Sequence, residues 1–150
     1  FDWGESVQLA DMNGNGSTDI VFVKRNSVRY FDLTGGVRPN LLTTIENGLG
    51  KRTTVEYKAS TQFYIDDLGT SQEWDRPLPF PVQVVSQIIV EDGLQHTYDP
   101  VSKNDNRLVI ENAYHDGYYD AKTQQFRGFR TAEQREIGDS TYPTTVRWSK

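Results

Sequence analysis

The chain has 150 residues, a formal net charge of -5, a hydrophobic content of 35% and no cysteine. The acidic balance and the scattered Lys and Arg residues exclude binding to nucleic acid through a broad basic surface. Without cysteine there is no disulfide, cysteine zinc site or thiol nucleophile. No apolar run approaches the roughly 20 residues of a membrane-spanning helix. Abundant β-branched and aromatic residues predict half-buried strands rather than disorder.

The first predicted elements are two short strands on either side of a polar loop. The strands read SVQLA and DIVFV, and the loop reads DMNGNGSTD. Side-chain oxygens recur at alternate positions of the loop, and two glycines let the backbone curl around a point. Hard oxygen ligands on a tight loop suit calcium. The sequence therefore predicts a structural Ca²⁺ site in a hairpin turn, with the ligands Asp11, Asn13, Asn15, Ser17 and Asp19.

The charge of this loop limits the affinity that we expect. Only Asp11 and Asp19 are anionic, which favours a dissociation constant near the roughly 10⁻⁴ to 10⁻³ M of extracellular calcium modules. The loop begins as an EF-hand loop does, but Phe22 stands where the final Glu would be. The alternative is a metal-free hairpin turn whose Asp and Asn side chains cap their own backbone.

The next predicted feature is a domain boundary in TGGVRPN, which ends at Asn40. This segment combines Gly-Gly with a proline between two strand patterns. We therefore divide the chain into residues 1–39 and residues 40–150. A unit of about forty residues leaves strand edges unpaired and little core, so the first unit is expected to complete a larger sheet assembly, such as a β-propeller blade.

Alternating patterns predict several strands after the boundary. The segment from Arg52 to Lys58 alternates strictly, Val82, Val84, Ile88 and Val90 are expected to share one face, and a third pattern begins at Leu108. RPLPFP, from Arg76 to Pro81, is a connector or an edge because proline lacks the N–H of a strand ladder. No helical pattern competes. We predict an all-β fold, with a terminal blade segment followed by a long antiparallel meander.

Some residues could suggest catalysis or sugar binding. His96 and His115 lie near acidic residues, and Ser60-Thr61 with the acids from Glu133 to Glu136 could suggest an ADP-ribosyltransferase, but HExxH and E-x-E spacings are absent. Solvated or strand-packed side chains explain these residues more simply. The aromatic residues favour cross-strand core pairs over a sugar-binding surface made by Trp3, Trp74 and Trp148.

Several segments together resemble a known family. VQLADMNGNGSTDIVF is similar to an FG-GAP propeller blade. NLLTTIENGLGKRTTVEYKAST, PFPVQVV and AYHDGYYDAKTQQFRGF resemble, in the same order, the middle region of Tc (toxin complex) insecticidal toxin B subunits and related plasmid-virulence proteins. By this resemblance, residues 1–39 correspond to the end of the propeller and residues 40–150 to the start of an Rhs/YD-type shell wall.

The resemblance implies a non-catalytic role in a secreted virulence factor. In that family the propeller docks onto the pore-forming A component, and the flanking sequence joins the effector-carrying C component in a β-shell around the toxic effector. Neither nucleic-acid binding nor direct membrane insertion is implied, and no family catalytic residue falls in this segment. The alternative function is a calcium-dependent adhesin or lectin-type β-propeller module, which would carry further blades downstream.

Overall fold

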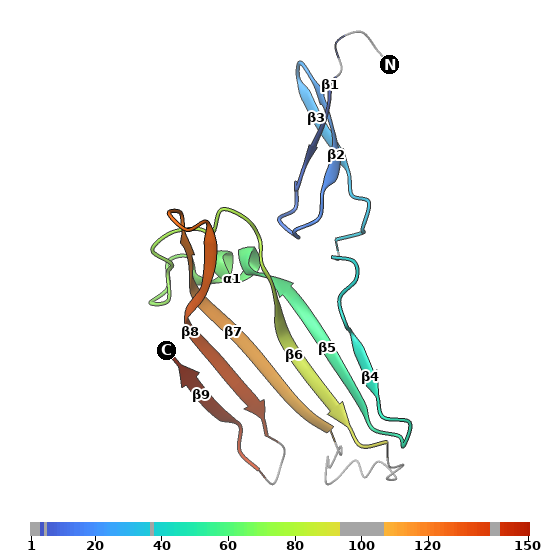
Figure 1. Cartoon of the computed structure of the whole chain (residues 1–150), viewed down its shortest axis with the longest axis vertical. Coiled ribbons are helices and arrows are strands. Elements are labelled where there is room, and N and C mark those ends of the chain that lie inside the picture. Colours follow the sequence, from blue (N-terminus) through green and yellow to red (C-terminus); the bar gives the residue numbers. More distant parts are fainter. Residues whose placement is uncertain (1–3, 5, 37, 94–106, 139–141) are drawn as a thin grey trace.

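The computed structural model describes residues 4, 6–36, 38–93, 107–138 and 142–150. Over these residues the chain forms a three-stranded and a six-stranded antiparallel sheet with a short helix (Figure 1). The predicted all-β fold is therefore confirmed. In chain order the elements are β1 (Ser6–Ala10), β2 (Asp19–Lys24), β3 (Ser27–Phe31), β4 (Thr44–Glu46), β5 (Arg52–Ala59), α1 (Ser60–Asp67), β6 (Gln83–Glu91), β7 (Arg107–Asp120), β8 (Gln125–Ile137) and β9 (Thr145–Ser149).

The three-stranded sheet has β2 at its centre. β2 pairs with β1 from Ala10 opposite Asp19, and with β3 as far as Lys24 opposite Ser27. Val21, on β2, is buried, whereas β1 and β3 are exposed along their whole lengths. This small sheet therefore buries little beyond its central strand.

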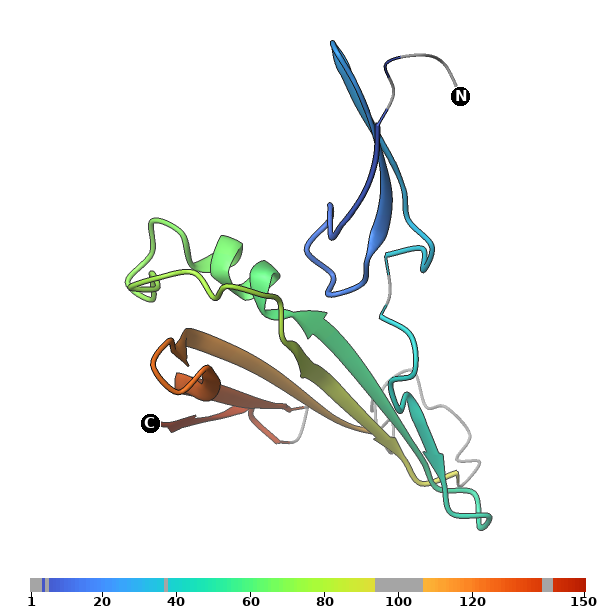
Figure 2. The same ribbon diagram turned by 45° about the horizontal axis from the view of Figure 1, so that its top comes forward.

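The six-stranded sheet is a meander, because its strand order from β4 to β9 is the order of the chain. Its longest pairing joins β7 to β8, from Val109 opposite Ile137 to Asp120 opposite Gln125. Figure 2 shows the twist of this sheet and the position of α1 at the end where β5 finishes. The predicted antiparallel meander is confirmed.

Strand β6 departs from the predicted alternation. Tyr57 pairs with Val85 but Glu56 pairs with Gln87, which leaves Ser86 as an extra residue in a bulge. A bulge moves the side chains that follow it to the opposite face of the strand. Val84 therefore shares its face with Gln87 and not with Ile88, so the prediction of one shared apolar face is wrong.

Helix α1 is the second departure from the predicted pattern, because no helix is predicted and one begins at Ser60. The helix has no side-chain cap on its first turn, so its support comes from tertiary contacts. The Ser60 N–H donates to Val82 O over 2.8 Å, and the Val82 N–H donates to Ser60 Oγ over 3.0 Å. Phe63 packs edge-on against Tyr114 at 5.7 Å between ring centroids.

An aromatic cluster forms the core between α1, the connector after it and strands β7 and β8. Trp74 is 5% exposed and packs edge-on against Phe129 at 5.9 Å between ring centroids. Gly117 allows this approach, because a Cβ there would lie 3.0 Å from Trp74 Cζ3 and 2.9 Å from Leu78 Cδ1. Trp74 is therefore a core residue. Trp148 is half exposed, and Trp3 lies outside the described residues.

Two connectors complete the chain path. The proline-rich segment from Arg76 to Pro81 lies outside the strands, between α1 and β6, as predicted. The chain passes from the first sheet to the second between Phe31 and Thr44, and the division into residues 1–39 and 40–150 stays a prediction. No helix in the described part of the chain is long and apolar enough to cross a membrane.

Candidate calcium loop and a buried carboxylate network

The predicted ligands lie in the loop that joins β1 to β2, which we call the Asp11–Asp19 loop. The two strands are antiparallel neighbours, so the loop is a hairpin turn, as expected. Gly14 and Gly16 have φ values of 70° and 82°, a region that side chains rarely adopt. These two glycines allow the backbone to fold back over the side chains of the loop.

Asp11 organises the loop backbone. Its Oδ1 accepts the N–H groups of Gly14 over 2.8 Å and Asn15 over 3.1 Å, and its Oδ2 accepts the Gly16 N–H over 2.7 Å. These bonds saturate Oδ1 and leave Oδ2 with one free lone pair. Asp11 therefore acts as the cap that the metal-free alternative expects, and it retains one site for a metal.

The two asparagines make shorter-range turns of the same kind. Asn13 Oδ1 accepts the Asn15 N–H over 3.1 Å, and Asn15 Oδ1 accepts the Ser17 N–H over 2.7 Å. Each amide oxygen keeps a second lone pair. The structure thus brings these predicted ligands into one tightly bonded loop.

The burial of the Asp19 carboxylate is not explained by capping of the loop backbone. Asp19 is 0% exposed, and its Oδ2 accepts the Met12 N–H over 2.9 Å. Its Oδ1 is buried and finds no hydrogen-bond partner within the described residues, and the same is true of Asn15 Nδ2 and Ser17 Oγ. A buried carboxylate oxygen without a partner is costly. A cation held in the loop would remove that cost.

The donor set therefore fits a hard cation better than a bare turn. Within the described residues no group of three or more His, Cys, Asp or Glu side chains is placed to hold a metal, and the loop itself contributes only two carboxylates. In this loop the two carboxylates would be joined by amide oxygens, which calcium accepts readily. Asp11 and Asp19 would supply the charge, and Asn13, Asn15 and Ser17 would complete the predicted ligand set.

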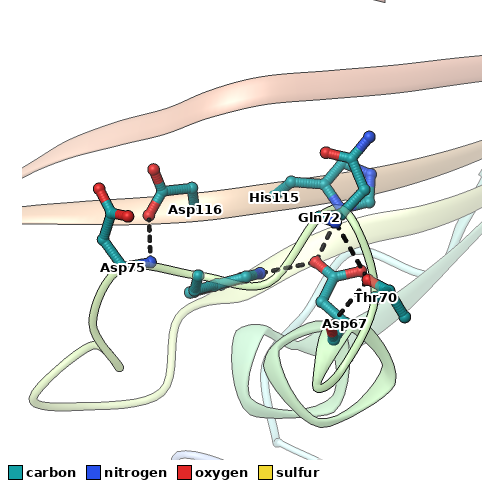
Figure 3. A network of polar contacts seen from close by, with 7 residues as sticks. Asp67, Thr70, Gln72, Asp75, His115 and Asp116 are labelled. Atoms are coloured by element: carbon teal, nitrogen blue, oxygen red, sulfur yellow. Dashed lines mark hydrogen bonds and ion pairs between the residues drawn. The ribbon is translucent and has the colours of Figure 1, made fainter.

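A second polar site is built around Asp67, at the end of α1 (Figure 3). Its Oδ2 lies 2.7 Å from His115 Nδ1 and accepts the Trp74 Nε1–H over 2.7 Å. All three side chains are buried, and Trp148 stacks on the His115 ring at 6.1 Å between centroids. The carboxylate thus ties α1, the connector and β7 together.

Asp116, beside His115 on β7, makes a second link to the connector. Its Oδ1 accepts the Asp75 N–H over 3.2 Å (Figure 3). Arg130 of β8 lies 3.1 Å from its Oδ2. Arg130 also reaches Asp75 over 3.4 Å. The connector after α1 is therefore held at two adjacent residues, Trp74 by the Asp67 carboxylate of α1 and Asp75 by the Asp116 carboxylate of β7.

The residues considered for catalysis have structural partners in this arrangement. His115 is buried beside Asp67, and its Nε2 has no partner in the described part of the chain. Ser60 bonds with Val82, and Glu133 accepts a hydrogen bond of 2.9 Å from Arg135. His96 lies outside the described residues.

The fold defines the class of protein to which the chain belongs. Two antiparallel sheets in this order match the B component of solved toxin complexes along the whole chain. Against TcdB2–TccC3–Cdc42 the match covers 100% of this chain at 27% identity and a TM-score of 0.71, and against TcdB2–TccC3 without its hypervariable C-terminal region it covers 100% at 27% and 0.70. The chain is thus an all-β segment of Tc-toxin B type.

The family follows from the sequence. The profile described as "Insecticide toxin TcdB middle/N-terminal region" matches residues 4–149, and the chain belongs to this family. It spans 6% of the length of the solved chains that it matches. A search of curated protein sequences found no match.

Proposed function

We propose that this chain is a non-catalytic structural segment of a secreted Tc-toxin B component. In that role it helps the B component to dock onto the pore-forming A component and, with the effector-carrying C component, to build the β-shell around the toxic effector. The observation that carries the proposal is the match of the whole chain to structures of TcdB2 with TccC3. The proposed function works by enclosure and docking.

The surface of the chain supports a role inside a larger assembly. Only Val21, Phe63 and Trp74 are buried hydrophobic residues in the described part of the chain. Large apolar side chains are exposed on the three-stranded sheet, including Leu9 at 71% and Phe31 at 60%, and on the six-stranded sheet, including Trp148 at 51%. Leu9 and Phe31 both pair with Ile20 of β2, so the three side chains form one row across the sheet. Contiguous exposed apolar surface marks interaction sites, so further parts of the assembly are expected to cover it.

The three-stranded sheet is proposed to be part of an FG-GAP-type propeller blade with one structural Ca²⁺. The buried, unpartnered Oδ1 of Asp19 supports this assignment. Calcium would act on structure alone, by neutralising the loop carboxylates and fixing the turn between β1 and β2. Because both sheets would then serve as scaffold, the Asp67–His115 pair is assigned a structural role.

Assembly with the C component tests the proposed function. Ile110→Asp places a charge on β7, where Ile110 pairs with Ile88 and Glu136 in the middle of the sheet. Leu49→Asp is the matched control, because Leu49 lies in the turn after β4 and is 89% exposed. The variants are made in the intact B polypeptide, which is co-expressed with the C component and purified through a tag on either partner.

We expect Ile110→Asp to lose the C component from the purified complex and Leu49→Asp to retain it. The reason is that Asp at position 110, which is partly buried, loses the apolar pair with Ile88 and lies opposite the like-charged Glu136, a loss of about 1 to 3 kcal/mol, whereas an exposed turn tolerates the same charge. If Ile110→Asp assembles as the wild type does and leaves the effector equally resistant to protease, the segment does not build the shell.

A further inference from the structure

The backbone of the Asp11–Asp19 loop contacts the six-stranded sheet directly. The Thr61 hydroxyl, in the first turn of α1, donates to Gly14 O over 2.8 Å. The Gln83 amide, at the start of β6, donates to Asn15 O. These partners are separated by 47 and 68 residues in sequence, so the hairpin turn of the first sheet is bonded to the second sheet.

The approach leaves little room for a side chain at the contact. A Cβ on Gly14 would lie 3.2 Å from Thr61 Oγ1, and a Cβ on Gly16 would lie 3.2 Å from Arg38 Nη1 and 3.8 Å from Gln83 Nε2. Both glycines also have positive φ, as described above. The same two residues thus shape the loop and let it lie against the second sheet.

The loop contacts the second sheet next to the hydrogen bonds that join the start of α1 to the segment before β6. Ser60 and Val82 bond reciprocally, and they are the direct neighbours of Thr61 and Gln83. The end of β5, the start of α1 and the start of β6 therefore meet at the loop. No strand of the three-stranded sheet pairs with a strand of the other sheet in the described ranges, so these loop contacts and the link between Phe31 and Thr44 set how the two sheets are placed.

Asn15 connects the interior of the loop to this contact. Its buried side chain is one of the predicted calcium ligands, while its backbone oxygen accepts the bond from Gln83. Fixing the side chain would hold the carbonyl in the direction that Gln83 needs. A pre-ordered acceptor lowers the conformational entropy that the contact costs.

We propose that the Asp11–Asp19 loop is the joint between the two sheets, and that calcium in the loop orders this joint through Thr61 and Gln83. The proposal rests on the calcium site of the proposed function and assigns a further structural role to that site. Calcium then fixes the orientation of the blade relative to the shell wall, in addition to the turn between β1 and β2.

Hydrogen exchange measured by mass spectrometry on the intact polypeptide tests the joint, with calcium alone as the probe against a chelator. The reporters are peptides that contain the amides of Ser60, Val82 and the remainder of α1. Peptides from the Asp11–Asp19 loop report binding itself. The variant is Thr61→Val with Gln83→Leu, and Gln62→Leu is the matched control because the Gln62 amide bonds to Asp66 on its own helix.

In the wild type and in Gln62→Leu, calcium is expected to slow exchange of the loop peptides and to slow the reporter amides by about tenfold, the effect of one well-formed hydrogen bond. In the double variant the loop peptides keep their protection and the reporters lose it. Thr61→Ser, made as a single variant, keeps the hydroxyl and is expected to retain most of the calcium-dependent protection of the reporter amides.

Two results overturn the joint, and they are distinguishable. Loop peptides protected by calcium, with reporters that do not respond or that respond equally in the double variant, refute the joint and leave the calcium site intact. Loop peptides that do not respond to calcium in the wild type refute the calcium site and the joint together.

Discussion

Replacing Asp67 with Ala removes the acceptor that ties helix α1 to the connector and the sheet. His115 Nδ1 and Trp74 Nε1 both lie 2.7 Å from Asp67 Oδ2 inside the buried core. A buried donor that loses its acceptor costs about 1 to 3 kcal/mol, so the free energy of unfolding should fall by about 2 to 6 kcal/mol for the two groups. At about 2 to 4 °C per kcal/mol, the melting temperature should fall by at least about 4 °C.

The neighbouring Asp66→Ala is the matched control. Asp66 is on the same helix, is exposed, and bonds only to Gln62 within the described contacts, so its loss should cost less than about 0.5 kcal/mol. Urea unfolding followed by tryptophan emission measures both variants. A loss of stability in Asp67→Ala no larger than in Asp66→Ala would refute the reasoning that the buried carboxylate holds the connector in place.

Three further predictions address other parts of the chain. Gly117→Ala should destabilise by about 1 to 3 kcal/mol through overpacking, because its Cβ would lie 3.0 Å from Trp74; an unchanged urea midpoint would contradict this. Burial raises the pKa of Tyr114. The contribution of its neutral hydroxyl to the free energy of unfolding is therefore fully present below about pH 10 and is lost as the pH rises through the raised pKa. Tyr114→Phe should therefore lose less stability between pH 9 and 11, both about one unit from the ordinary tyrosine pKa, and an identical loss in both proteins would refute it. Asp11→Ala should abolish the rise in melting temperature that about 5 mM calcium causes, a rise of about 2 to 8 °C in the wild type.

The strands and the hairpin turn could be predicted because their signals are local. Asn-Gly and alternating residues specify the turn from Asp11 to Asp19 and the strand from Arg52 within a few positions of sequence. The connector from Arg76 to Pro81 is equally local, since each proline removes a donor. These features depend on neighbours that the sequence itself supplies.

The features that the sequence does not predict depend on distant partners. Helix α1 lacks a capping side chain and depends on Val82 and Tyr114. The Asp67–His115 contact joins residues that are 48 positions apart. The bulge at Ser86 carries no Gly or Pro signal, although it reverses the faces of β6.

The same distinction applies to the candidate calcium site. Alternate oxygens indicate the ligands, but the complete burial of Asp19 and the unpartnered state of its Oδ1 within the described chain emerge only from the packing around the loop. The contacts to Thr61 and Gln83 likewise require both sheets to be in place. The sequence therefore indicates the oxygen ligands, and the fold shows the buried carboxylate that a cation would neutralise.

The blade assignment and the joint both depend on a calcium ion in the Asp11–Asp19 loop. Calorimetric titration of calcium into the intact polypeptide, compared with its Asp19→Asn variant, measures this ion directly. Asn at position 19 keeps the size of the side chain and removes the buried charge. We predict that the variant binds one calcium ion fewer than the wild type, with other binding unchanged. Equal stoichiometry and affinity in the two proteins would contradict the site.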